Sequence, residues 1–363
     1  AGTGVRYHGF DAGGLSAFSV QGVADLSRIG KQTLVFSVPP RIAARTAIAG
    51  PKEAKGPLAE YFDILFDDDL LGMKSWELAE GEMVRRAAER TIAEAGIRPE
   101  QVEAMICGDL NNQIIASSFA ARSLGIPFMG QYGACTTFIQ SLILGGALID
   151  GGHLNNALCC ASSHFCTAER QFRFPLEMGN QRPPQASWTA TACGCALLTA
   201  GTGAGLRITQ GTIGRVVDFG IKDANHMGAA MAPAVFDTIA AHFEDTGRSP
   251  ADYDLIVTGD LGFIGRELLL ELLNRRGISM PEDKLIDCGM QLYYPEQDAH
   301  AGGSGCGCVA SVSCGWIMRR IEGGELRRVL IAGSGAMLSP TSTLQGESIP
   351  SISYAACVEG DNA

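Results

Sequence analysis

The feature that most constrains this chain is an internal repeat of two long segments whose starts lie 151 residues apart. Residues 96–110 read GIRPEQVEAMICGDL, and residues 247–261 read GRSPADYDLIVTGDL. In both segments proline follows glycine by three residues, and a short apolar strand then leads into Gly-Asp-Leu. A repeat of this length indicates two related structural units rather than a short-period solenoid.

A second pair of segments supports the duplication. Residues 154–164 (LNNALCCASSH) and 326–336 (LRRVLIAGSGA) each read as a strand that ends in small residues. Helical patterns alternate with these short apolar strands in both halves, as in the amphipathic stretch that begins at Ser75 and stops at Gly96. The alternation predicts an α/β protein whose sheets are covered by helices.

We expect three regions along the chain. An N-terminal extension spans 1–30, a first half that carries Cys135 spans 31–205, and a second half spans 206–363. With 363 residues, 46% of them apolar and only 18% charged, the chain can bury a large interior.

Charge and hydropathy exclude several classes of function. The net charge of −11 argues against non-specific binding to nucleic acid or to an anionic membrane surface. No apolar run of about 18 residues and no signal peptide is visible, so we expect a cytosolic location. The twelve cysteines contain no C-x-x-C pair, so we expect reduced, buried thiols and no metal centre.

Cys135 lies where a short strand, IPFMGQ at 126–131, meets a long apolar helix that begins TTFIQ. A thiol at the N-terminus of a helix is near the positive end of the helix dipole, which favours the thiolate. The same position also suits an anionic ligand without any chemistry. The local sequence therefore leaves a nucleophile and a ligand cradle equally open.

The GACTT motif in a duplicated α/β chain resembles the thiolase superfamily, in particular the ketoacyl-acyl-carrier-protein synthase III branch. The resemblance implies five layers, α/β/α/β/α, and a nucleophilic cysteine activated by a histidine and an asparagine from the second half. In this sequence Gly259 or Asp260 stands at the histidine position, Gly303 stands at the asparagine position, and His300 lies three residues early. We therefore expect no synthase catalysis, and an acidic Asp260 opposes thiolate formation.

Longer motifs point to one family within this superfamily. ASSHFCTAERQFRFP at 161–175, DFGIKDANHMGAAMAPAVFDTI at 218–239 and AGGSGCGC at 301–308 resemble the stage V sporulation protein AD family, and the likeness covers about 31–359. The resemblance implies a non-catalytic protein that binds dipicolinic acid and works with membrane-embedded SpoVA proteins in dipicolinate uptake and release. It also implies a peripheral location on the cytoplasmic face of the spore inner membrane, and the thiolase fold implies a homodimer.

A planar dianion needs charge-assisted donors and a flat apolar wall. Eight residues in the recognised segments are candidates for such a dipicolinate site: Cys135 and Thr136 with the backbone N–H groups that follow, His164, Arg170, Arg173, Asp260, Gly303 and Ser304. Calcium is expected only as part of the ligand, beside Asp260.

Structural roles remain open for several of these residues. Arg170 could equally form a structural ion pair with Glu169, and Arg173 could equally form a structural ion pair. His164 suits a position in the core where its hydrogen bonds are satisfied. Asp109 suits a turn at a strand end, and the Met-rich segment NHMGAAMAP suits packing.

Two other functions remain open. The first is an acyl-transferring enzyme in which Cys135 is acylated and His300 or His164 acts as the base. The second is a structural subunit whose degenerate pocket binds nothing.

Overall fold

The computed structural model describes residues 28–172, 182–361 and 363, so the expected extension at 1–30 lies almost entirely outside the described residues. One large mixed sheet runs through the molecule in the order β12-β11-β14-β15-β10-β3-β9-β7-β5-β6. Its strands from the first half are β3 (Arg41–Ala49), β5 (Met105–Gly108), β6 (Phe128–Gly130), β7 (Asn156–Ser163) and β9 (Ala192–Thr199). Those from the second half are β10 (Arg207–Thr212), β11 (Leu255–Thr258), β12 (Leu285–Asp287), β14 (Arg328–Ala336) and β15 (Ser351–Glu359). Short strands complete the described set: β1 (Arg28–Ile29), β2 (Thr33–Val35), β4 (Ile64–Leu65), β8 (Trp188–Thr189) and β13 (Gly303–Ser304).

The two halves of the sheet repeat one another strand by strand. In the first half, β3, β9 and β7 are antiparallel neighbours, and β5 and β6 then follow in parallel. In the second half, β10, β15 and β14 are antiparallel, and β11 and β12 follow in parallel. The sequence repeats fall on matching strands, β5 with β11 and β7 with β14. The predicted duplicated α/β fold is therefore confirmed.

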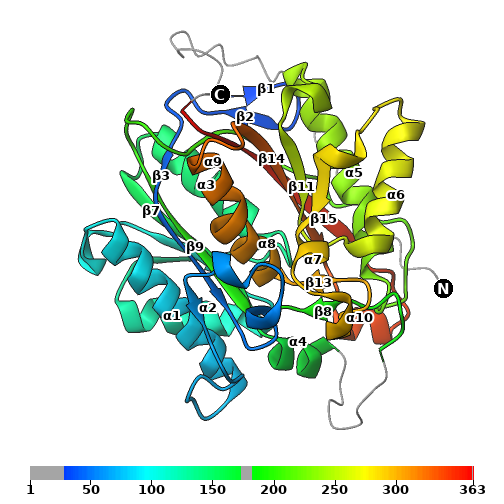
Figure 1. The fold of residues 1–363 in the computed structure, drawn as a ribbon, viewed down its shortest axis with the longest axis horizontal. Helices are drawn as coiled ribbons and strands as arrows, with labels where there is room; N and C mark the ends of the chain where they lie inside the picture. Colours follow the sequence, from blue (N-terminus) through cyan, green and yellow to red (C-terminus); the bar gives the residue numbers. More distant parts are fainter. Residues whose placement is uncertain (1–27, 173–181, 362) are drawn as a thin grey trace, which may run out of the picture.

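Helices cover both outer faces of the sheet and fill the space between its halves (Figure 1). The helices α1 and α2 lie against the first half, α5 and α6 lie against the second, and α3, α8 and α9 lie between the halves. This arrangement gives the five layers expected of a thiolase-like protein. The helix bounds are α1 (Trp76–Glu94), α2 (Ile115–Leu124), α3 (Thr137–Asp150), α4 (Phe165–Phe172), α5 (Met227–Thr246), α6 (Gly262–Arg275), α7 (Cys288–Gln291), α8 (Cys306–Val312), α9 (Met318–Glu322) and α10 (Pro340–Leu344).

The helix α1 begins where its sequence pattern predicts. The Ser75 side chain accepts a hydrogen bond from the Leu78 N–H, which satisfies one of the free donors of the first turn. The apolar face of α1, including Met83 and Ala87, is fully buried against the sheet. Burial of this face fixes α1 and its polar residues beside the first half of the sheet.

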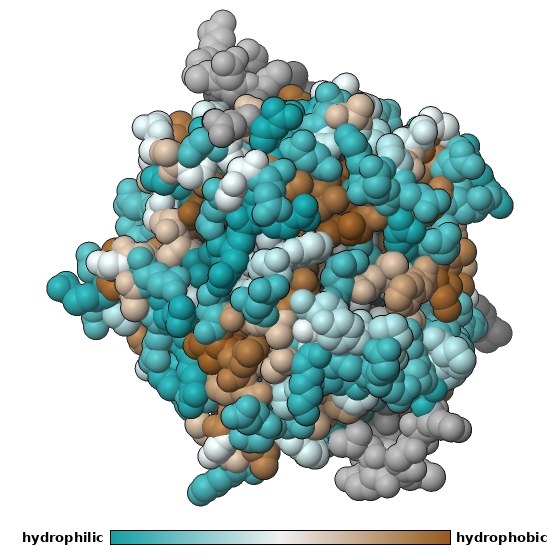
Figure 2. Space-filling view, in the orientation of Figure 1, coloured by the Kyte–Doolittle hydropathy of each residue, from teal (hydrophilic) through white to brown (hydrophobic). Residues whose placement is uncertain are grey.

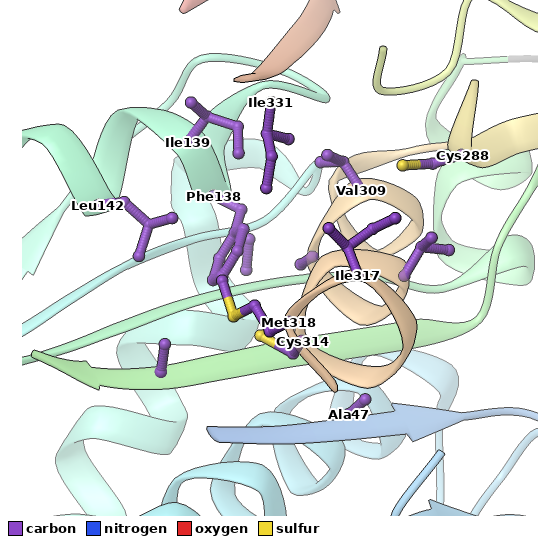
Figure 3. Close-up of a cluster of buried hydrophobic side chains, with 14 of the residues drawn as sticks. Ala47, Phe138, Ile139, Leu142, Cys288, Val309, Cys314, Ile317, Met318 and Ile331 are labelled. Atoms are coloured by element: carbon purple, nitrogen blue, oxygen red, sulfur yellow. The ribbon is translucent and has the colours of Figure 1, made fainter. Parts of the chain in front are cut away.

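The central helices are held by an apolar cluster that both halves share (Figure 3). Phe138 and Leu142 of α3 lie in the same cluster as Val309 of α8, Met318 of α9 and Ile331 of β14, and all five are at most 1% exposed. Each such side chain contributes about 1.5–3 kcal/mol by leaving water. The cluster therefore fixes the start of α3, where Cys135 lies, relative to both halves.

No helix in the described parts of the chain is both long and apolar enough to cross a bilayer.

All twelve cysteines are free thiols, and eleven of them are buried.

Candidate ligand-binding site

Cys135 lies between β6 and α3, and it is 9% exposed. The turn that carries it places Ala134 in the left-handed region, with a φ of 49°. The N–H groups of Thr136 and Thr137 donate to the carbonyls of Gly133 and Ala134, each at 3.2 Å. We expected the backbone N–H groups directly after Cys135 to bind a carboxylate of the ligand. These two N–H groups are not free to do so, because they already form hydrogen bonds within the turn.

Asp260 follows β11, and its side chain is fully buried. One carboxylate oxygen accepts hydrogen bonds from the Ser304 hydroxyl at 2.8 Å and from the Gly305 N–H at 2.9 Å. The other oxygen accepts from the Ser334 hydroxyl at 2.6 Å. The Cys135 thiol lies close enough to this carboxylate for the charge of Asp260 to raise the pKa of the thiol. Asp260 therefore joins Cys135 of the first half to three groups of the second half.

The environment of Cys135 opposes the thiolate. Burial is the largest cause that raises the pKa of the Cys135 thiol well above its usual value, and the charge of Asp260 raises it further. These effects outweigh the position at the start of α3. The raised pKa of the thiol agrees in direction with the expectation that Asp260 disfavours the thiolate, and it does not favour a reactive thiolate at this helix terminus.

A narrow pocket opens above the Cys135 thiol. Its water-accessible volume is about 50 Å³, and its walls are mainly apolar. Among the described residues that line it, Glu169 alone carries a formal charge. The lining consists of Leu110, Tyr132, Ala134, Cys135, Ala168, Glu169, Phe172, Thr189, Met227, Met231, Ser304, Ala336 and Leu338. We call this space the inner pocket.

The structure brings only part of the predicted ligand set to the inner pocket. Cys135 and Ser304 line it, and Asp260 lies directly behind them. Thr136 is fully buried, and its hydroxyl accepts from the Tyr354 N–H at 3.4 Å. Gly303 belongs to β13 and pairs with β8 rather than lining the pocket.

Two of the predicted cationic donors, His164 and Arg170, are absent from the described lining of the inner pocket. The Nε2 atom of His164 is hydrogen-bonded to the Asp69 carbonyl at 2.7 Å, which favours the structural role for this histidine. Arg170 forms an ion pair with Glu77 of α1, and its guanidinium lies 5.2 Å from the centre of the Trp76 ring. The partner expected for Arg170 was Glu169. Arg173 lies outside the described residues.

The alternative bases for acyl transfer also lie elsewhere. The Nδ1 atom of His300 is 2.9 Å from the Pro183 carbonyl, and its Nε2 atom is 2.8 Å from the Asp298 carboxylate. His300 and His164 are both absent from the described lining of the inner pocket.

Several residues of the site have no assigned role in the sequence analysis. Ser334 bonds twice to Asp260, since its hydroxyl also accepts from the Asp260 N–H at 2.9 Å. Tyr132 and Phe172 form aromatic walls, and Met227 and Met231 line the pocket although packing alone was expected of them. Met227 and Met231 are four residues apart and therefore lie on one face of α5. This spacing was the sequence signal that could have identified them as pocket residues.

A larger space adjoins the inner pocket, and we call it the outer compartment. Its water-accessible volume is about 410 Å³, and it shares Tyr132, Phe172 and Leu338 with the inner pocket. Most of its polar lining consists of side-chain amides. The lining residues are Asn111, Asn112, Gln113, Ile114, Gly130, Gln131, Tyr132, Gln171, Phe172, Leu338, Ser339 and Pro340.

Comparison with known proteins decides the family. The model of the stage V sporulation protein AD family matches residues 30–359. The chain belongs to the stage V sporulation protein AD family. It is 41% identical over 330 residues to stage V sporulation protein AD of Bacillus subtilis (strain 168), an alignment that covers 91% of this chain and 97% of the relative. The family places this chain among sporulation proteins.

Solved structures confirm the thiolase-like fold. OleA of Xanthomonas campestris superposes with a TM-score of 0.60 at 14% identity, covering 90% of this chain and 99% of OleA. The 3-oxoacyl-[acyl-carrier-protein] synthase III of Aquifex aeolicus superposes with a TM-score of 0.53 at 13% identity, covering 88% of this chain and 99% of the synthase. At such identities the likeness establishes the fold of this sporulation protein AD family member and nothing about its chemistry.

Proposed function

We propose that this sporulation protein is a non-catalytic binding protein for dipicolinate, acting in dipicolinate uptake during sporulation and release in germination. The observation that carries the non-catalytic part is the buried Asp260 carboxylate, which Ser304, Gly305 and Ser334 hold near the Cys135 thiol. A carboxylate at this position raises the pKa of the thiol, whereas a condensing enzyme needs a base that lowers it. Cys135 then serves as part of a pocket wall.

The lining of the inner pocket supports a ligand with an apolar face. Tyr132, Phe172, Met231 and Leu338 offer apolar surface, and the Ser304 hydroxyl offers a polar contact. Such pockets recognise small planar molecules through many apolar contacts and a few fixed polar groups. The dipicolinate assignment itself follows from the family resemblance.

The charges around the inner pocket favour the calcium complex over the free dianion. Asp260 and Glu169 are acidic, and the described lining contains no lysine or arginine. A dianion placed there experiences repulsion, whereas a one-to-one complex of calcium with dipicolinate is neutral. Calcium binds six to eight oxygen ligands, so the complex retains positions for carboxylate and hydroxyl oxygens. We therefore propose that calcium accompanies the ligand.

A calorimetric titration tests this proposal. The protein is titrated at pH 7.5 with dipicolinate, with and without an equal concentration of calcium. We expect saturable binding that is tighter with calcium and weakened at least tenfold by Met231→Trp, which fills the inner pocket. Phe263→Ala, an exposed position on α6, is the control and leaves binding unchanged. Absence of binding under both conditions contradicts the proposed ligand.

A second measurement separates binding from acyl transfer. The protein is incubated with a panel of acyl-CoA thioesters and its intact mass is measured. We expect no added acyl group. A mass increase that disappears in Cys135→Ala favours the acyl-transfer alternative.

We propose a homodimer that docks on membrane-embedded SpoVA proteins at the cytoplasmic face of the spore inner membrane. The strand β6 lies at the edge of the sheet, with Met129 41% exposed and Tyr132 39% exposed next to it, which suits pairing with a second copy. On the face seen in Figure 2, apolar residues form separate groups among hydrophilic ones, which suits a protein partner better than lipid. Sedimentation equilibrium tests the dimer, and co-purification with the SpoVA proteins tests the complex.

A further inference from the structure

The outer compartment contains a buried amide that has no partner. Gln131 is 8% exposed, and neither its amide nitrogen nor its amide oxygen has a hydrogen-bond partner. Its backbone is fixed, because its N–H donates to the Cys107 carbonyl at 3.0 Å. A buried polar atom without a partner costs about 1–3 kcal/mol. The wall of the outer compartment therefore holds one donor and one acceptor whose hydrogen bonds a ligand can supply.

A neighbouring amide of the same compartment is already satisfied. The Gln171 oxygen accepts from the Asn112 N–H at 2.8 Å, and its nitrogen donates to the Leu110 carbonyl at 2.8 Å. These bonds hold the loop that follows β5 against α4. The fold therefore satisfies Gln171 internally, whereas the Gln131 amide has no hydrogen-bond partner within the structure.

The described lining of the compartment suits an uncharged ligand. No Asp, Glu, Lys, Arg or His is among the described residues that line it. A tyrosine with its usual pKa of about 10 is neutral at physiological pH, and the surroundings of the Tyr132 hydroxyl raise its pKa further. Tyr132, Phe172 and Pro340 provide flat apolar surfaces, which suit a planar molecule.

The geometry of a primary amide further restricts the functional groups that a ligand can present to Gln131. Its N–H and C=O groups lie side by side, so a complementary group presents an acceptor beside a donor. Carboxamides, lactam edges of heterocycles and protonated carboxyl groups have this arrangement. A carboxylate has only acceptors and satisfies only half of the Gln131 amide.

We propose that the outer compartment is a binding site for an uncharged planar ligand that carries a carboxamide or an equivalent donor–acceptor pair, which forms two hydrogen bonds with the Gln131 side chain. This site does not depend on dipicolinate binding in the inner pocket. The two spaces share Tyr132, Phe172 and Leu338, so a ligand in either space contacts these three residues.

A titration with pyridine-2,6-dicarboxamide, a planar and uncharged probe, tests the proposal. We expect saturable binding to the full-length protein and at least tenfold weaker binding to Gln131→Leu, which keeps the size of the side chain but removes both polar atoms. Gln140→Leu is the matched control, since the Gln140 oxygen is also buried without a partner but the residue lines neither space. This control binds the probe as the wild type does.

Two results overturn the proposal. They are no binding of the probe to the wild type and equal binding of the probe to Gln131→Leu. If the second result comes with a change in the sedimentation equilibrium of Gln131→Leu, the amide is assigned to a contact between subunits. If Gln131→Leu does not fold, Gln131→Glu replaces it, because an acceptor-only side chain also loses at least tenfold in affinity for the probe. Unchanged affinity in Gln131→Glu likewise contradicts the proposal.

Discussion

The Asp260 carboxylate lies close enough to the Cys135 thiol for its charge to raise the pKa of the thiol, and this proximity brings together the two halves of a duplicated fold. Asp260 comes from the end of β11, and Cys135 precedes α3. The carboxylate has additional donors in Ser304, Gly305 and Ser334, so its position is fixed independently of the thiol. The site therefore holds a buried carboxylate near the thiol, where its charge opposes thiolate formation.

The first prediction concerns thiol reactivity. Asp260→Asn removes the charge that raises the pKa of Cys135, so the pKa of the thiol falls toward its usual value. For each unit of decrease, alkylation of Cys135 by iodoacetamide at pH 8 becomes about tenfold faster. The rate is followed by mass spectrometry of the peptide that contains Cys135. Asp109→Asn, the repeat-related position in the first half, is the control and leaves this rate unchanged. An unaltered rate in Asp260→Asn contradicts the assigned electrostatic role.

The sequence predicts the fold because the fold is duplicated. The Gly-Asp-Leu repeat marks the ends of β5 and β11, and the second repeat marks β7 and β14, so the repeats alone locate these four strands. The resemblance to the synthase III branch then places Asp260 opposite Cys135. These inferences succeed because they depend on local patterns with a fixed spacing.

The remaining part of the site depends on contacts that no local pattern encodes. Ser334 meets Asp260 across 74 residues of sequence, through the pairing of β11 with β14. Arg170 is a plausible anion donor in its motif, yet α4 directs it to Glu77, 93 residues earlier. A sequence shows that a donor exists, but the packing of distant elements decides which acceptor it meets.

The second prediction concerns stability and pH. Burial is the main cause that raises the pKa of Glu53 to about 7, although the Tyr293 hydroxyl donates a hydrogen bond to it. The folded protein therefore favours the protonated form of Glu53. The resulting contribution to the free energy of unfolding is fully present below pH 4.5, the usual pKa in the unfolded chain, and it is lost as the pH rises through about 7. Glu53→Gln removes this dependence, so the variant gains up to about 3 kcal/mol relative to the wild type between pH 4.5 and 8. Urea unfolding at several pH values measures the difference. A constant difference across this range contradicts the prediction.

The third prediction concerns the backbone beside Asp260. Gly305 has a φ of 99°, and a Cβ atom there would lie 2.5 Å from the Ser163 hydroxyl oxygen. Gly305→Ala therefore combines backbone strain with a steric clash, and we expect a loss of at least about 2 kcal/mol in unfolding free energy. Gly324→Ala is the control, since its φ is 76° but no atom lies within 4 Å of the added Cβ. Strain alone costs the control about 1 kcal/mol. Equal losses in thermal or urea unfolding would show that the contact with Ser163 is unimportant.

The last prediction concerns Ser334, which no sequence motif identifies. Its hydroxyl donates to the Asp260 carboxylate and accepts from the Asp260 N–H, and both groups are buried. Ser334→Ala leaves two buried polar groups without this partner, so we expect a loss of about 2–4 kcal/mol in unfolding free energy. Ser342→Ala, on the part-buried helix α10, is the control, because its side chain bonds to no group of the site. The loss in Ser334→Ala shrinks in the double variant with Asp260→Asn, since the carboxylate is then no longer charged. A double-mutant cycle by urea unfolding measures this coupling, and additive losses would show that the two side chains act independently.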